Sequence, residues 1–292
     1  MRSGDLVARP IVRPERAARQ WPRLRAAPAK LALWCFVLWS AFPFYWMLKS
    51  ALEPAASVYD PALIIRSVSL ENLGILLTQT GFLGNARNSL VVALTTSVLV
   101  CVCAAIGGYA LSRYGIPRKR TIAQVILFTY MFPEILLGIP FFSLFRQLGL
   151  LNSLFGLSLA HLTLSFPFAL WLMWQTFEGL PREYEEAAAI DGAGSLRTFL
   201  LIVCPMVRPA LAAIFIFAFA ASWNDYTLSL MLVRDNQMLT LPVSVSLFVT
   251  QLQFNWAVIQ SGAILLAVPG LILLLLGQRY LVRAFGGGGL AN

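Results

Sequence analysis

Six runs of apolar residues, each close to or above the length that crosses a bilayer, constrain this chain more than any other feature. A transmembrane helix needs about 20 mainly apolar residues, because the hydrocarbon core is about 30 Å thick and each residue adds about 1.5 Å. The chain is also 59% hydrophobic and only 12% charged, against about 25% charged in soluble domains. The sequence therefore predicts an all-α integral membrane protein with spans at about 31–48, 90–111, 122–145, 154–177, 210–232 and 257–277.

The first run follows a basic region, as the apolar part of a signal peptide would. It is long for such a segment and contains Pro43, and Lys49-Ser50-Ala51-Leu52-Glu53 follows it in place of a cleavage site of small residues. We therefore expect it to be a retained span.

Basic residues are distributed unequally between the two sides that six spans define. Seventeen of the 22 Lys and Arg residues fall in the N-terminal tail, the loops 112–121 and 178–209, and the C-terminal tail. Cytoplasmic segments carry such an excess, so we expect both termini and the loop 178–209 in the cytoplasm. The expected organisation is a disordered basic tail at 1–30 held near anionic lipid, a six-helix membrane domain at 31–285, and a Gly-rich tail at 286–292. This placement accounts for the net charge of +9 without a nucleic-acid partner.

The inventory of reactive residues argues against an enzyme. The only histidine, His161, lies inside the fourth run, where a packed or pore-lining role is favoured over a ligand role. The three lysines stand outside any phosphate-binding G-x-x-x-x-G-K-[ST] loop, and the four cysteines lack metal or redox spacing. We expect no catalytic residue, metal site or cofactor here, so energy for uphill transport must come from a partner or an ion gradient.

The loop 178–209 contains a short polar segment that is rich in Glu and Ala. Pro181 suits the first turn of a helix, and Glu183, Glu185 and Glu186 suit its positive N-terminal end. Ala187–Ala189 favour the helix, and Gly192 can end it in a left-handed conformation. Two turns of helix are marginal in isolation, so docking onto a partner would explain the segment. Composition alone leaves an ordinary capped loop helix equally open.

The spacing of this segment resembles a known motif. Glu186-Ala187-Ala188, then Gly192, then Ile202-x-Cys204-Pro205 is similar to the EAA motif, EAA-x3-G-x9-I-x-LP, of the permease subunits of bacterial ABC importers, with Cys204 where Leu is usual. The resemblance covers nearly the whole chain after residue 31 and is closest to the MalG-like carbohydrate branch. Further matching stretches are 49–54, 70–73, 88–93, 108–113, 148–152, 180–184, 223–225, 241–242 and 278–279.

The resemblance implies a type I ABC importer permease fold in the bacterial plasma (inner) membrane. It implies a heterodimer with a sister permease, two cytoplasmic ATPase subunits that bind ATP and Mg, an extracytoplasmic solute-binding protein, and a sugar or polyol as cargo. ATP-driven motion of the ATPases would move the EAA helix and switch the spans between inward-open and outward-open states. The final Lys-Gly common in the family is missing from the Gly-rich end. The residues implied in coupling are Glu185, Glu186, Ala187, Ala188, Asp191, Gly192 and Pro205.

A second group of polar residues falls inside the apolar runs. Trp223, Asn224 and Asp225 lie in the fifth run, and Glu134 lies in the third. A carboxylate at bilayer depth costs about 2.5–3.5 kcal/mol on insertion scales, so it normally faces a cavity or a partner. These residues are candidates for the translocation path, and hydrogen bonding between helices or to the sister permease is the alternative.

Two other functions remain open at this point. An ABC permease for a non-sugar solute, such as a glycerol phosphodiester or a polyamine, would share the EAA helix. A secondary transporter would show paired intramembrane charges and an inverted repeat, and neither is evident in the sequence.

Overall fold

The computed structural model describes residues 26–251 and 255–286, which are helical with short connections and contain no strand, so the predicted all-α class is confirmed. Four described helices are long and apolar enough to cross a membrane, or six if each of two bent pairs counts as one span. The four are α1 (Ala26–Leu52), α3 (Phe82–Arg113), α6 (Leu154–Glu178) and α13 (Trp256–Gly286). Most of the expected basic tail and nearly all of the Gly-rich tail fall outside the described residues, so these domain limits stay predictions.

The chain divides into two compact units, and the part of α1 up to Trp46 belongs to the first. Large apolar side chains along this part are exposed on every side, and Trp39 is 82% exposed. A helix that is apolar all round is stable when lipid or another apolar surface covers it. The α1 segment therefore has the character of a membrane span.

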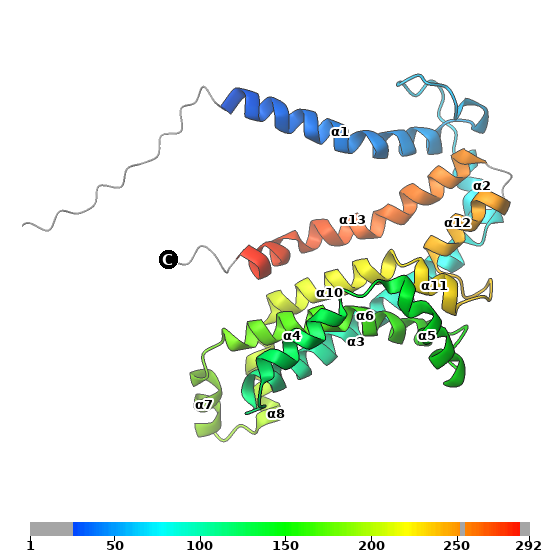
Figure 1. Cartoon of the computed structure of the whole chain (residues 1–292). Coiled ribbons are helices and arrows are strands. Elements are labelled where there is room, and N and C mark those ends of the chain that lie inside the picture. The colour runs from blue at the N-terminus through cyan, green and yellow to red at the C-terminus, as the bar shows by residue number, and fades with distance from the viewer. Residues whose placement is uncertain (1–25, 252–254, 287–292) are drawn as a thin grey trace, which may run out of the picture. The chain divides into compact units, whose positions relative to one another are not determined.

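In the second unit, α3 and α6 form the most extensive helix pair, and α10 (Arg208–Trp223) packs against both (Figure 1). Their contact surface holds a large buried apolar cluster that includes Met173, Phe177 and Ile214. Gly108 makes the close approach possible, because a Cβ there would lie 2.7 Å from the Met173 Cβ and 2.8 Å from the Trp174 amide nitrogen. Small residues play this role in membrane helices, where packing rather than hydrophobicity drives association.

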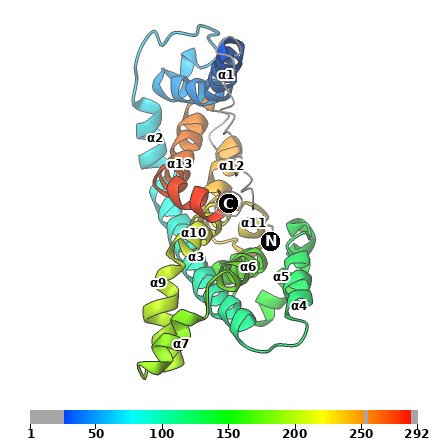
Figure 2. The same ribbon diagram turned by 90° about the vertical axis from the view of Figure 1, so that its left-hand side faces the viewer.

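The third expected span is a bent pair rather than one helix. It consists of α4 (Lys119–Thr129) and α5 (Glu134–Gln147), whose axes are inclined by 94°. Pro133 stands at the break, where its ring excludes the preceding residue from the helical region and removes a backbone donor. In Figure 2 the pair stands beside α6.

The fifth expected span also differs from the prediction. The helix α10 ends at Trp223, and the rest of the apolar run forms a separate short helix, α11 (Thr227–Leu232). Before α10 the chain runs through α7 (Glu183–Ile190), α8 (Ser195–Thr198), the π-helical turn η3 (Phe199–Val203) and α9 (Cys204–Met206). The Cys204 amide donates to the Phe199 carbonyl, five residues back, and the segment 195–206 is bent by 77° from α10.

At the end of the unit opposite α7 lie the short helices α2 (Glu71–Gln79) and α12 (Leu241–Gln251), together with the turn η2 (Ala55–Ser57) (Figure 1). Just before helix α2, the Ser69 hydroxyl accepts a hydrogen bond from the Glu71 amide at 3.2 Å. Asn88 of α3 fastens the loop before α12 by donating to the carbonyls of Gln237 and Leu239, at 2.8 and 3.0 Å.

A buried ion pair holds this end together. The Lys49 ammonium, 1% exposed, lies 2.7 Å from the Glu53 carboxylate, which also accepts the Arg66 amide. Asn72 of α2 donates to the carbonyls of Ala51 and Glu53. The end of α1, the following loop and α2 are therefore joined through one polar cluster.

Candidate functional site

The Glu-Ala segment forms the helix α7 that the sequence predicts, with eight residues. Three glutamates lie in its first turn, where the partial positive charge of the helix N-terminus stabilises their carboxylates. Pro181 was expected in that turn, but the helix begins at Glu183, so the proline precedes it.

Gly192 ends α7 as predicted, with φ of 78° in the left-handed region. The Gly192 amide donates to the Ala189 carbonyl and the Ala193 amide donates to the Ala188 carbonyl, at 3.1 and 2.9 Å. These two bonds make a Schellman motif, which satisfies the last carbonyls of the helix. The turn therefore depends on glycine, since a side chain at this φ is strained.

The two faces of α7 differ in character. Glu186, Ala187 and Ile190 are exposed, and Ile190 is 87% exposed. Ala188 is buried against the rest of the hairpin formed by residues 183–206, and Glu185 is half-buried. One face is thus free to meet a partner, while the other is fixed to the chain itself.

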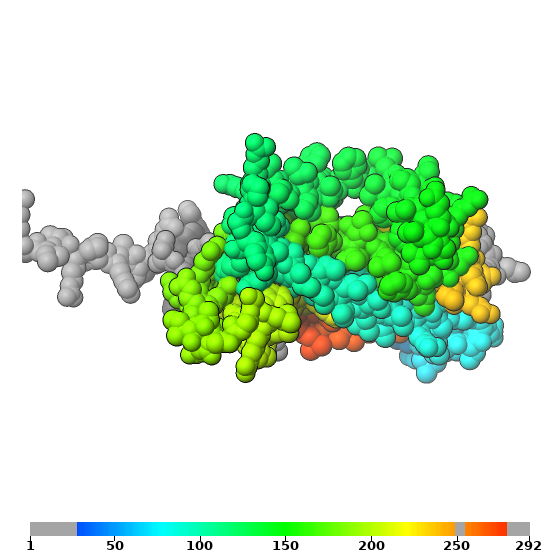
Figure 3. Space-filling model, turned by 90° about the horizontal axis from the view of Figure 1, so that it is seen from below, coloured from blue at the N-terminus to red at the C-terminus, as the bar shows by residue number. Residues whose placement is uncertain are grey.

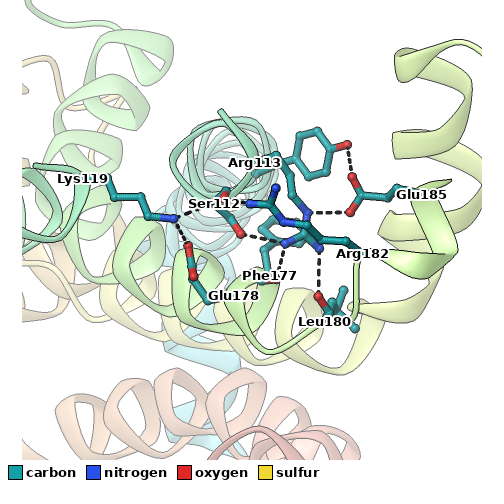
Figure 4. Close-up of polar contacts among 9 residues, drawn as sticks. Ser112, Arg113, Lys119, Phe177, Glu178, Leu180, Arg182 and Glu185 are labelled. Carbon is teal, nitrogen blue, oxygen red and sulfur yellow. Dashed lines mark hydrogen bonds and ion pairs between the residues drawn. The ribbon is translucent and has the colours of Figure 1, made fainter. Parts of the chain in front are cut away.

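Arg113, at the C-terminal end of α3, fixes that inner face (Figure 4). Its Nε lies 2.6 Å from the Glu185 carboxylate, and the Tyr109 hydroxyl donates to the other oxygen of Glu185 at 2.8 Å. The remaining guanidinium nitrogens donate to the carbonyls of Phe177 and Leu180, at 2.9 and 3.2 Å, at the end of α6. We call Arg113, Glu185 and Tyr109 the clamp, because they join α3, α6 and α7.

A second ion pair supports the same region. Lys119, at the start of α4, lies 2.5 Å from Glu178 at the end of α6, and the Trp174 indole also donates to Glu178. Arg182 donates to the Ser112 carbonyl at 3.3 Å, so the residue before α7 is also tied to α3 (Figure 4).

The structure separates the residues that the sequence grouped as coupling residues. Glu186, Ala187 and Asp191 are exposed, and Gly192 forms the turn. Glu185, Ala188 and Pro205 instead lie wholly or partly inside the hairpin or against α3. Sequence reasoning missed the roles of Tyr109 and Arg113, although the stretch 108–113 was noted. The sequence did contain a signal: Tyr109 and Arg113 lie one helical turn apart at the end of the second apolar run, and the loop 178–209 supplies carboxylates that could pair with them.

A separate cavity of about 140 Å³ lies where α4 and α5 meet, against α6 and α10. Figure 3 shows the surface hollowed between the ridge of α4 and α5 and the body beneath it. Among the described residues, no group of three or more His, Cys, Asp or Glu side chains is placed to hold a metal ion. The lining combines polar and aromatic groups: Tyr130, Glu134, His161, Leu164, Ser165, Phe217, Ala221, Ser222 and Asp225.

His161 and Asp225 form a buried polar network on one wall of this cavity. The His161 Nδ1 lies 2.7 Å from the Ser222 hydroxyl, and its Nε2 lies 3.0 Å from the Asp225 carboxylate. Asp225 also accepts the amides of Leu228 and Ser229 and the Ser229 hydroxyl, so it caps the start of α11. The histidine, which the sequence could place only as packed or pore-lining, belongs to this network.

Of the four residues predicted for the translocation path, Glu134 and Asp225 line the cavity, while Trp223 and Asn224 lie elsewhere. Glu134 lines the cavity with Asp225, and its buried Oε1 has no hydrogen-bond partner within the described part of the chain. Trp223 is 3% exposed, stacks on Phe219 and donates to the Leu266 carbonyl, so it ties α10 to α13. Asn224 is exposed at the end of α10 and donates to the Ala220 carbonyl.

Comparison with known proteins finds relatives that are permease proteins of sugar transport systems. The trehalose transport system permease protein SugB of Mycobacterium tuberculosis (strain CDC 1551 / Oshkosh) is 31% identical over 252 residues, covering 86% of this chain and 92% of SugB. The maltodextrin transport system permease protein MdxG of Bacillus subtilis (strain 168) is 34% identical over 224 residues, covering 76% and 81%.

A solved bacterial ABC transporter, described as involved in the import of the acidic polysaccharide alginate, contains a chain of the same fold. That chain superposes with a TM-score of 0.77 at 24% identity, over 88% of this chain and 96% of its own length. Residues 102–286, which include α7, the clamp and the cavity, match the model of one transport family. The chain therefore belongs to the family of binding-protein-dependent transport system inner membrane components.

Proposed function

We propose that this chain is one of two transmembrane subunits of an ATP-driven importer for sugars or related polyols. The observation that carries the proposal is the exposed face of α7, held at the tip of a hairpin whose other face is clamped to two long spans. A partner that moves α7 would move α3 and α6 with it. That is the mechanical link that an importer without its own phosphate-binding loop requires.

The partners follow from this arrangement. Two cytoplasmic ATPase subunits bind ATP and Mg and receive α7, so both termini of this chain lie in the cytoplasm, as the distribution of basic residues favours. Glu186 meets a basic group of the ATPase, Ala187 permits close approach, and Ile190 supplies an apolar contact. A sister permease completes the path, and a solute-binding protein docks at the opposite end, near α2 and α12.

A sugar is the cargo that the relatives favour. The names of SugB and MdxG state transport of trehalose and of maltodextrin. Neither SugB nor MdxG is named for a phosphodiester or a polyamine. Membership of a binding-protein-dependent family argues against the secondary-transporter alternative.

Charge reversal on the exposed face of α7 tests the coupling. In the complete complex in proteoliposomes, Glu186→Lys is expected to reduce sugar uptake and sugar-stimulated ATP hydrolysis at least tenfold, because it places like charges together in a desolvated contact. The matched control is Glu183→Lys, the same change one turn earlier on the same exposed helix, which should retain most activity. Normal uptake by the Glu186→Lys complex, with assembly intact, would refute the coupling role of α7.

A further inference from the structure

The cavity between the α4–α5 bend, α6 and α10 has no part in the α7 contact, yet it gathers costly polar groups inside the membrane part of the chain. We propose that it is a binding subsite of this subunit for one ring of a neutral sugar, with Glu134 as the acceptor for ring hydroxyls and Phe217 in the aromatic wall. This inference rests on the proposed sugar cargo and adds which residues hold it and which sugars they reject.

The size of the cavity fits one ring. Its volume is about 140 Å³, and an enclosed apolar cavity of about 150 Å³ is known to hold one benzene ring. Sites for larger ligands measure about 300–1,000 Å³. The cavity therefore admits a single six-membered ring and leaves the rest of an oligosaccharide outside.

One wall is aromatic. The rings of Tyr130, Phe168 and Phe217 contact one another, with centroid separations of 5.9 Å (Tyr130–Phe168), 6.2 Å (Tyr130–Phe217) and 4.7 Å (Phe168–Phe217). Tyr130 and Phe217 line the cavity directly. Such a wall can pack against the C–H face of a sugar ring, which is its apolar side.

The polar residues of the lining offer hydrogen-bond acceptors, but some of these acceptors are already occupied. Asp225 already accepts three donors from α11 and lies 3.0 Å from the imidazole of His161. A carboxylate accepts about four hydrogen bonds, so Asp225 is nearly satisfied and serves to orient His161. Glu134 differs: its carboxyl group lies against Asp225 and the Leu228 backbone, yet its buried Oε1 has no hydrogen-bond partner among residues 26–251 and 255–286. A hydroxyl-rich ring would supply the missing donor.

The charges select among sugars. Two carboxylates and one imidazole line the cavity, and the described lining contains neither lysine nor arginine. An anionic sugar would therefore face like charge without a compensating cation, whereas a neutral ring would not. We expect a preference for neutral sugars over uronates, in contrast to the alginate transporter of the same fold.

Sugar binding to the purified complex without its solute-binding protein tests this subsite. The probes are radiolabelled trehalose, maltose, maltotriose and diacetylchitobiose, together with a disaccharide containing glucuronic acid, in equilibrium dialysis. Glu134→Gln should weaken binding of the transported neutral sugar at least tenfold, because one acceptor oxygen of the carboxyl group is replaced by an NH2 donor. It should also reduce the difference in affinity between neutral and acidic sugars, an effect that a purely structural role of Glu134 would not produce.

Thr163→Val is the matched control, since Thr163 lies on α6 two residues from His161 but is exposed and bonded to the Leu159 carbonyl. Basal ATP hydrolysis reports assembly, and Phe217→Ala tests the same subsite if Glu134→Gln does not assemble. Wild-type affinity of both cavity variants for a transported sugar, or competition by spermidine at equal strength, would overturn the subsite. If the complete complex in proteoliposomes takes up no sugar of the panel, the sugar cargo itself is overturned, and the role of α7 is then judged by the effect of Glu186→Lys on basal ATP hydrolysis.

Discussion

At the scale of single residues, two glycines carry structure that other residues cannot. Gly192 provides the left-handed turn after α7, and Gly108 provides the contact of α3 with α6. The sequence predicted the first, because a glycine after an Ala-rich segment is a common helix end. It could not predict the second, because closeness between helices depends on which faces meet, and one sequence does not state that.

Gly108→Ala should destabilise the protein by about 1–3 kcal/mol, because the new methyl group would meet the backbone of α6 as well as a side chain. Gly84→Ala is the control on the same helix, since a Cβ there has no neighbour within 4 Å. That change should be neutral or stabilise by up to about 1 kcal/mol. Thermal unfolding in detergent would compare them, and equal stability of the two variants would contradict the close contact.

At the scale of elements, the clamp turns a marginal surface helix into part of a rigid assembly. Helix α7 has only eight residues, too few to persist alone, yet Arg113 binds Glu185 and the end of α6 together. Sequence patterns predicted the helix and its glycine end. They grouped Glu185 with the partner-facing residues because pattern alone does not reveal a contact formed 72 residues away along the chain.

A double-mutant cycle of Arg113→Ala and Glu185→Ala should show a coupling energy of about 0.5–3 kcal/mol in thermal unfolding. Arg113→Lys should recover little of it, since an ammonium cannot reach three acceptors in the fixed directions of a guanidinium. Proteolysis within residues 178–206 should become faster in each variant. The control Arg120→Ala, at an exposed position of α4, should behave as wild type. Additive effects of Arg113→Ala and Glu185→Ala would show that the two side chains act independently.

At the scale of the whole molecule, the number of apolar runs predicted the number of possible spans, but not their continuity. The third run breaks at Pro133 and the fifth stops at Trp223, and both interruptions border the polar cavity. Hydropathy averages over such breaks, because the residues around them remain apolar. The carboxylates Glu134 and Asp225 were the visible signs that the helices could not be uniform there.

The opposite end of the second unit relies on the Lys49–Glu53 pair. Glu53→Gln should cost about 3–5 kcal/mol of stability, since it removes the carboxylate charge that lies 2.7 Å from a buried ammonium. The double variant Lys49→Met/Glu53→Gln should recover much of that loss. Unfolding in detergent and proteolysis of the loop 54–70 would measure both. A double variant less stable than Glu53→Gln alone would show that Lys49 stabilises through other contacts.

The number of residues in the π-helical turn η3, and not only their identity, determines how α7 is oriented relative to α10. This turn holds one residue more than an α-helical turn would, and each residue of an α-helix turns the chain by about 100°. Removing one residue between Phe199 and Val203 would restore regular winding and rotate everything on its N-terminal side, α7 included, relative to α10. The exposed side of α7 that carries Glu186 and Ile190 would then point in a different direction. A single deletion in this turn would therefore disturb the orientation of α7 even if every remaining residue stayed apolar.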